Sequence, residues 1–333
     1  MRRLLLICPI LVCLSMFFVS CEKQDQPIVL PPPSGAQHAS VDMGEDYTDQ
    51  VFYNLASGKI VYTSKVSSWH LAFESTPLGY HIYINGERDF SVFNTHRTEM
   101  QDVYDTSMVN GKPWQIDDYN GASNATAIGE WLNGAGTSKR EVFILKCNPG
   151  DIADTFLKIQ LGYTNEGYIL TYSKLRDNAP KTVVIPKDPN YNFVYFSLKD
   201  ERITTPEPPK NTWDIVFTHY RSTQLIYNNA VFPYQVSGVL LNANNTTAAV
   251  DSVTAYQNMN ADKISSMHFS DARDIIGFNW KDYDRVAGHY TVKQNKVYVI
   301  KTQDNKYFKM HFLDFYNAQG IKGNPSFEYE QMQ

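Results

Sequence analysis

Four short blocks of strand-forming residues occur twice along this chain, in the same order and at a nearly constant interval. The blocks begin at these paired positions: Val51 and Val194, Ser68 and Thr212, Val142 and Val297, and Leu157 and Phe308. A similarity that recurs at one interval over this much sequence indicates a duplicated structural unit. We therefore expect two related domains, residues 45–176 and 190–333, joined by a segment that contains three prolines.

The pattern inside the blocks is that of β-strands. In the block at Phe308, apolar residues alternate with Lys309 and His311, which predicts a strand with one face buried and the other, including His311, in solvent. The continuous apolar runs at 142–145 and 297–300 predict strands covered on both faces. No long stretch has a clean helical period, although 262–273 predicts a short helix. The expected fold class is all-β, with two tandem, related, antiparallel domains that are each sandwich-like.

Residues 1–20 have the composition of an export signal. Arg2 and Arg3 precede an apolar run that is too short for a lasting membrane span. Residues 18–21, Phe-Val-Ser-Cys, resemble a bacterial lipobox, which predicts cleavage before Cys21 and lipidation of that cysteine. An ordinary cleaved signal or an uncleaved anchor would explain the same run. Residues 21–44 are polar and proline-rich, and we expect an extended tether between the lipid and the globular body.

Charge and cysteine content exclude several classes of function. The 30 basic and 35 acidic residues give a net charge of −5 without a basic cluster, so we expect no nucleic-acid partner. Once Cys21 is lipidated and the segment before it is removed, Cys147 is the remaining cysteine. This leaves no internal disulfide and no cysteine-based zinc site. We expect Cys147 to be buried.

No motif of a known catalytic type is present, and we expect a binding protein rather than an enzyme. The acidic pair Asp117 and Asp118 would point to opposite faces of a strand, which makes it a poor acid–base couple. We expect this pair to lie in a solvated turn. Trp69 and Trp213 hold equivalent positions in the two halves, which favours core packing over ligand stacking.

The segment between the strand blocks of the second half is rich in aromatic, methionine and histidine residues. Six of them are of types that ligate haem iron: Tyr256, Met259, Met267, His268, Tyr283 and His289. Flat apolar rings beside such ligands are what a haem pocket requires. A loop with packed aromatic residues would have the same composition.

Several stretches resemble the HmuY-like haem-binding lipoproteins of the bacterial outer membrane. They are residues 195–198, 213–220 and the closing block 297–329, together with 92–100 in the first half. The lipobox also fits that family. The resemblance implies an all-β fold without catalysis, with haem held by two axial side chains. It further implies exposure on the cell surface and transfer of haem to a TonB-dependent outer-membrane receptor.

The resemblance also implies where the iron ligands lie. One family ligand is seven positions into a stretch that begins Gly-aromatic, which is 277–283 here and places Tyr283 at the ligand position. His289 is the substitute if the loop shifts. The second ligand would come from the preceding segment, with these candidates: Tyr256, Met259, Met267 and His268. The matching stretch of the first half, 129–136, has no ligand at this position, so we expect the first domain not to bind haem.

The same residues are compatible with two other functions. The family's usual histidine is replaced by Tyr283, so the fold could serve a glycan, a peptide or another tetrapyrrole instead. The chain could also be an accessory subunit that docks on an outer-membrane transporter through exposed aromatic residues. Tyr283 itself could be a core or rim tyrosine.

Overall fold

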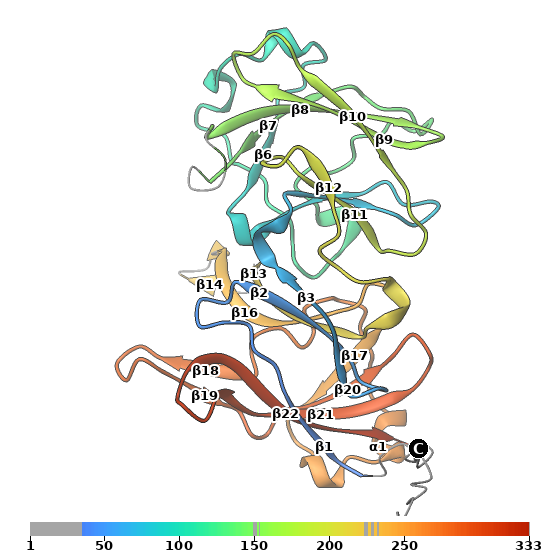
Figure 1. Cartoon of the computed structure of the whole chain (residues 1–333), viewed down its shortest axis with the longest axis vertical. Coiled ribbons are helices and arrows are strands. Elements are labelled where there is room, and N and C mark those ends of the chain that lie inside the picture. The colour runs from blue at the N-terminus through green and yellow to red at the C-terminus, as the bar shows by residue number, and fades with distance from the viewer. Residues whose placement is uncertain are drawn as a thin grey trace, which may run out of the picture. The chain divides into compact units, whose positions relative to one another are not determined.

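The fold is built from antiparallel strands with short connections, as the sequence pattern predicts (Figure 1). The computed structural model describes residues 35–148, 152, 154–222, 226–227, 230–231 and 233–332. The export signal, Cys21 and residues 22–34 of the expected tether lie outside these residues. The expected end of the tether at 44 is wrong, because residues 37–40 pair with 326–329 in a sheet and Val41 and Met43 are buried in the core. None of the helices in the described part is long and apolar enough to cross a membrane.

The first sandwich packs a five-stranded sheet against a four-stranded one. The larger sheet contains, in spatial order, β10 (Lys181–Pro186), β9 (Gly167–Lys174), β8 (Phe156–Thr164), β7 (Val142–Lys146) and β6 (Ser91–Asn94). The smaller sheet contains β12 (Arg202–Thr204), β11 (Phe193–Ser197), β4 (Leu71–Glu74) and β5 (Ile82–Ile84). The facing side chains form one apolar core that includes Phe73, Phe143 and Phe196.

The second sandwich also packs a five-stranded sheet against a four-stranded one. The larger sheet contains β1 (Gln37–Ser40), β22 (Lys322–Met332), β21 (Tyr307–Tyr316), β20 (Val297–Lys301) and β17 (Thr247–Asp251). The smaller sheet contains β16 (Tyr234–Leu241), β13 (Ile215–Ser222), β2 (Asp49–Asn54) and β3 (Lys59–Lys65). Its core includes Phe217, Phe312 and Phe327.

The two sandwiches exchange strands. β2 precedes the whole first sandwich in the sequence, yet it pairs with β13 in the second sandwich. β11 lies beyond the first expected domain, yet it pairs with β4 in the first sandwich. Figure 1 shows β2 and β3 beside β13 and β16, from which they are distant in sequence. Strand pairing therefore does not follow the expected boundaries at 45–176 and 190–333.

The exchange is reciprocal, because β2 pairs with β13 and β11 pairs with β4. The two sandwiches also have matching strand orders. In the smaller sheets, the order β12-β11-β4-β5 corresponds to β3-β2-β13-β16. The duplicated blocks at Val51 and Val194 are β2 and β11, and the blocks that contain Trp69 and Trp213 lead into β4 and β13. Each first block pairs with the tryptophan block of the other half. The all-β fold of two related antiparallel sandwiches is thus confirmed.

Short elements connect the strands. The 3-10 helices are η1 (Val66–Ser68), η2 (Gly86–Arg88), η3 (Met100–Asp102), η4 (Ser107–Val109), η5 (Ser123–Ala125), η6 (Lys210–Thr212) and η7 (Tyr256–Asn258). Two hairpins are formed by β14 (Ile226–Tyr227) with β15 (Ala230–Val231) and by β18 (Lys281–Asp284) with β19 (His289–Val292).

The predicted helix at 262–273 is shorter than expected. The helix α1 spans Ala261–Ser265, and the side chain of Asn260 caps it by accepting a hydrogen bond from the Lys263 backbone. Beyond it, the chain turns extended because Ser270 exchanges backbone hydrogen bonds with Ala248 of β17.

The alternating strand pattern is right for the apolar residues and wrong for the polar ones. Phe308, Met310 and Phe312 of β21 are buried, but Lys309 and His311 are also only 7% and 8% exposed. The segment 256–267 covers that face of the sheet. His311 stacks on Tyr256 with 4.2 Å between ring centroids, and its Nε2 lies 2.8 Å from a Glu328 carboxylate oxygen. The expected solvent exposure of His311 is therefore wrong.

Other expectations about burial are confirmed. The runs 142–145 and 297–300 are buried at every position, and Cys147 is buried as well. Trp213 is fully buried. Trp69 differs from it, because Trp69 is partly buried and lines a cavity between the sandwiches.

Candidate functional site

The six predicted iron ligands fall into two separate groups. The first group surrounds α1. Tyr256 and Met259 are 6% and 2% exposed and belong to an apolar cluster with Val297 of β20. Met267 packs against the same cluster, and His268 beside it is exposed. Tyr256 and Met259 therefore act as packing residues in this structure.

The second group is on the hairpin β18–β19. Tyr283 is 50% exposed, and its ring centroid lies 4.7 Å from that of Tyr290 across the hairpin. His289 is exposed and stacks on Tyr316 of β21 with 4.5 Å between centroids. Tyr283 pairs with Tyr290, whereas His289 pairs with Asp284. The alternation of strand side chains therefore places Tyr283 and His289 on opposite faces of the hairpin.

The sheet that contains β21 separates the two groups. Tyr256 stacks on His311 at one face of β21, and Trp280, just before the hairpin, stacks on Phe312 at the other face with 3.9 Å between centroids. Successive strand residues point to opposite faces. The structure thus does not bring the two groups together. Within the described ranges, no three His, Cys, Asp or Glu side chains form a metal-binding cluster.

A buried lysine anchors the base of the hairpin. Lys281 is 6% exposed, and its Nζ donates to the Ser237 carbonyl oxygen at 2.6 Å. The same Nζ lies 4.2 Å from the Trp280 ring centroid and 4.6 Å from that of Phe315. Burial in this apolar surrounding lowers the pKa of Lys281 to about 7.

We expect Lys281 to make stability depend on pH above neutrality. Its pKa is about 7 when folded, against roughly 10.4 when unfolded. Between these values the unfolded state binds one more proton, so the free energy of unfolding rises with pH. From pH 7 to pH 9 this rise should be about 2 kcal/mol larger in the wild type than in Lys281→Met.

Urea unfolding at pH 7, 8 and 9 measures the difference. Lys293→Met is the matched control, because Lys293 pairs with Asp282 near the same hairpin with a side chain that is 31% exposed. This control should keep the wild-type slope. Equal slopes for the wild type and Lys281→Met would contradict the prediction.

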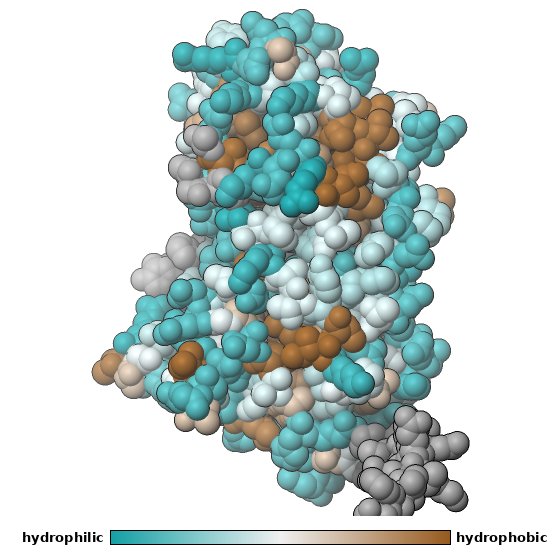
Figure 2. Space-filling view, viewed as in Figure 1, coloured by the Kyte–Doolittle hydropathy of each residue, from teal (hydrophilic) through white to brown (hydrophobic). Residues whose placement is uncertain are grey.

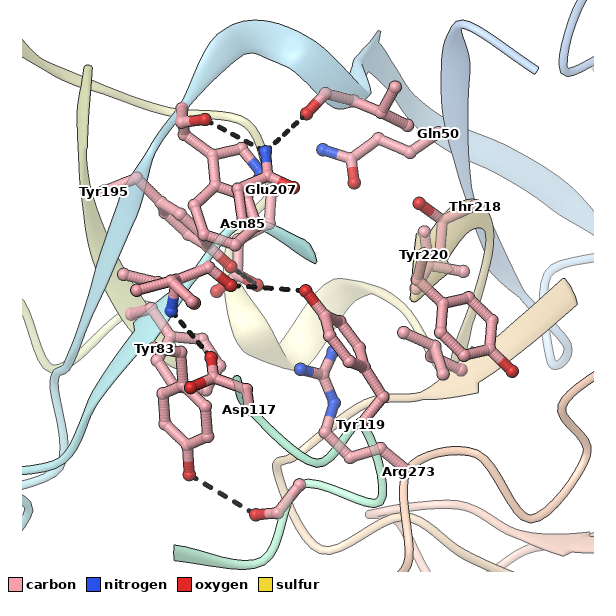
Figure 3. Close-up of a pocket in the computed structure, with 18 of the residues that line it drawn as sticks. Gln50, Tyr83, Asn85, Asp117, Tyr119, Tyr195, Glu207, Thr218, Tyr220 and Arg273 are labelled. Carbon is pink, nitrogen blue, oxygen red and sulfur yellow. Dashed lines mark hydrogen bonds between the residues drawn. The ribbon is translucent and has the colours of Figure 1, made fainter. Parts of the chain in front are cut away.

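A cavity lies between the two four-stranded sheets, on the face that each sheet turns away from its own core. The cavity volume is about 80 Å³, several times the roughly 10–15 Å³ that one buried water needs. Its aromatic lining consists of Phe52, Trp69, Tyr83, Tyr119, Phe193, Tyr195 and Tyr220. Its polar lining includes Gln50, Asn85, Asp117, Glu207, Thr218 and Arg273 (Figure 3).

Asp117 is buried beside this cavity, which overturns its expected place in a solvated turn. It is 3% exposed. Its two carboxylate oxygens accept hydrogen bonds from the backbone nitrogens of Ile84, at 2.7 Å, and Ala127, at 2.6 Å. These bonds tie the loop after Asp117 to β5. Burial nevertheless dominates and raises the pKa of Asp117 to about 7.

Glu207 is the second buried acid of the cavity wall. It is 3% exposed, and its carboxylate accepts from the Asn192 backbone nitrogen at 3.0 Å and from the Tyr195 hydroxyl at 2.8 Å. Burial raises the pKa of Glu207 to about 7 as well. The two acids therefore lose most of their charge below neutral pH.

No pattern in the sequence marks Asp117, Glu207 and Arg273 as neighbours of one cavity. They come from three distant segments, and the reciprocal strand exchange brings these segments together. No local periodicity marks such an exchange. The available signal was the acidic pair at 117–118, which lacked any indication of burial.

The fold defines a duplicated antiparallel β-sandwich protein with a small interior cavity. Residues 190–329 match the family model described as HmuY protein. The matched segment runs from before β11 into β22, so it includes strands of both sandwiches. A search of curated proteins gave no match.

Three solved structures are similar to the chain. Apo PinO from Porphyromonas gingivitis is 11% identical, with 90% of this chain and 99% of that chain covered and a TM-score of 0.31. A putative HmuY-like heme-binding protein from Bacteroides vulgatus is 12% identical, with 91% and 95% covered and a TM-score of 0.25. The apo HmuY analog of Tannerella forsythia is 13% identical, with 90% and 96% covered and a TM-score of 0.25.

Proposed function

We propose that this protein is a non-catalytic, haem-binding lipoprotein of the cell surface. The observation that carries the proposal is the HmuY match over residues 190–329. The proposed haem contact is the hairpin β18–β19, which lies inside the matched segment. Transfer of the haem to a TonB-dependent outer-membrane receptor and anchorage through lipidated Cys21 belong to the same proposal.

The hairpin offers donors of suitable chemistry. A tyrosine phenolate and a histidine imidazole are both known haem ligands, and Tyr283 and His289 are accessible without unfolding. Tyr290 and Tyr316 beside them supply flat rings against which a porphyrin can pack. In the group around α1, Tyr256 and Met259 are buried in an apolar cluster and would have to leave that cluster to reach haem iron. Tyr283 is therefore the preferred ligand, and His289, on the opposite face of the hairpin, is its substitute. Met267 and His268 are the alternatives.

A visible absorption titration with ferric haem tests the proposal, using the soluble chain from residue 22. We expect a saturable Soret shift at one haem per chain. Tyr283→Phe keeps the ring and removes the ligating oxygen, so it should weaken binding at least about tenfold, which corresponds to about 1.4 kcal/mol. His289→Ala tests the substitute donor on the opposite face of the hairpin. Tyr104→Phe, at a tyrosine that is 60% exposed in the first sandwich, is the control.

The outcome separates the ligand groups. A shift weakened by Met267→Ala/His268→Ala but unchanged in the hairpin variants would move the site to the segment around α1. A titration that resembles free haem in buffer would remove the haem proposal. Glycan arrays and receptor pull-downs would then test the two other functions. Figure 2 shows that apolar side chains form separate patches on the face in view. Ile60 and Val61 of β3 are 47% and 37% exposed.

A further inference from the structure

The guanidinium of Arg273 lines the inter-sheet cavity and has hydrogen-bond donors that no described residue satisfies. Its Nε donates to the Leu241 carbonyl oxygen at 3.2 Å. Among the described residues, its terminal nitrogens have no hydrogen-bond or ion-pair partner. By contrast, the two oxygens of Asp117 and those of Glu207 are already bonded. A guanidinium with free terminal nitrogens presents the planar fork that binds a carboxylate through two hydrogen bonds.

Several contacts hold Arg273 in this position. Its backbone nitrogen donates to the Asn120 carbonyl oxygen at 2.8 Å. Its aliphatic stem lies against Gly121, where an added Cβ would come within 2.7 Å of the arginine Cγ. Gly121 has φ +80°, a conformation that other residues rarely adopt, so the glycine permits both the turn and the close approach. The guanidinium lies over the Phe193 ring at 5.8 Å, and Figure 3 shows it reaching into the cavity near Tyr119.

The charges around the cavity favour an anion below neutral pH. The guanidinium of Arg273 supplies a positive charge. Burial raises the pKa values of Asp117 and Glu207 to about 7 and lowers that of His219 to about 4, so all three are mostly neutral at pH 6. Asp118, the remaining acid of the lining, accepts hydrogen bonds from Asn120 within its own turn.

The rest of the cavity is suited to the apolar part of a small ligand. Aromatic rings from both sheets face it, including Phe52 from β2 and Tyr195 from β11. A second, more open hollow shares Tyr83, Phe193 and Arg273 with the cavity, so Arg273 stands where the two spaces meet. A ligand that enters by this route would reach the guanidinium first.

We propose that the cavity between the four-stranded sheets is a binding site for a small organic carboxylate, with the Arg273 guanidinium as its anion contact. The aromatic rings of the two sheets contact the remainder of the ligand. The site is separate from the hairpin β18–β19, because Tyr283 and His289 are not among its lining residues.

Matched pairs of carboxylates and amides test the proposal at pH 6. The probes are acetate, butyrate and benzoate, each against acetamide, butyramide or benzamide, measured by calorimetry and by the rise in Tm of the soluble chain. At least one carboxylate should bind and raise Tm, and its amide should bind at least about tenfold more weakly. Arg273→Gln should weaken the carboxylate by at least about tenfold, and Arg273→Lys should do so less because it keeps the charge without the fork.

Two further variants keep the test independent of folding defects. Ala72→Leu fills the cavity from β4 and leaves Arg273 in place, so it should abolish binding in a chain with a wild-type circular dichroism spectrum. Arg202→Gln, at an exposed arginine of β12, should bind as the wild type does. Equal binding of carboxylates and amides, no binding of any probe at 50 mM, or wild-type affinity in folded Arg273→Gln and Ala72→Leu would overturn the proposal.

Discussion

A fragment of residues 190–333 is expected to remain unfolded, whereas a fragment of residues 66–208 should fold. The first fragment lacks β2, the partner of β13, and β1, the partner of β22, and it carries β11 without β4. The second fragment contains every strand of the first sandwich and the apolar core between its sheets. We expect a cooperative unfolding transition in the second fragment and none in the first, because a sandwich without central strands exposes its core.

Urea unfolding followed by far-UV circular dichroism, together with amide dispersion in NMR spectra, distinguishes the outcomes. A fusion of residues 35–66 to 207–333 through a flexible linker is the control, since it restores the strands of the second sandwich. This fusion should unfold cooperatively. A cooperative transition in the isolated 190–333 fragment would show that strand pairing follows the sequence halves after all.

Trp280→Ala should cost about 3–5 kcal/mol of stability, the range for removing a large aromatic side chain from a core. Trp280 is 1% exposed, stacks on Phe312 at 3.9 Å and meets Phe315 edge-on. Among the described residues its ring nitrogen has no hydrogen-bond partner, so the loss reports packing. Because Trp280 directly precedes β18, the change should also weaken any ligand held by the hairpin.

Urea unfolding monitored by circular dichroism gives the change in the free energy of unfolding. Val286→Ala provides the control in the same hairpin, because Val286 is 99% exposed and should tolerate the change within about 0.5 kcal/mol. A loss below about 1 kcal/mol in Trp280→Ala would mean that the hairpin side of the core is loosely packed.

Local sequence patterns were enough to predict the class of fold. Alternation at 308–312 and the apolar runs at 142–145 and 297–300 depend on neighbouring residues, and β-strands follow from them directly. The repeat of the four blocks correctly indicated two related sandwiches. Which strand pairs with which was beyond these patterns, because β2 suits β4 or β13 equally well by local propensity.

The candidate sites show the same limit. Lys309 and His311 have the sequence pattern of an exposed strand face, but the distant segment 256–267 covers them. Asp117 has the pattern of a turn, but backbone nitrogens of Ile84 and Ala127 stabilise its burial. In both cases a segment that is distant in sequence determines the burial of these residues. The pattern of neighbouring residues therefore does not predict that burial.

The reciprocal exchange also sets an order of assembly. The strands of the first sandwich are contiguous in the sequence, so this sandwich can close as soon as β12 has been translated or exported. The second sandwich has to wait, because β1 at one end of the chain pairs with β22 at the other. Closing so long a loop is slow, and until then β1 lacks β22 and the hairpin of β2 and β3 lacks β13. A chaperone that binds extended apolar segments would therefore find its substrate in the strands made first.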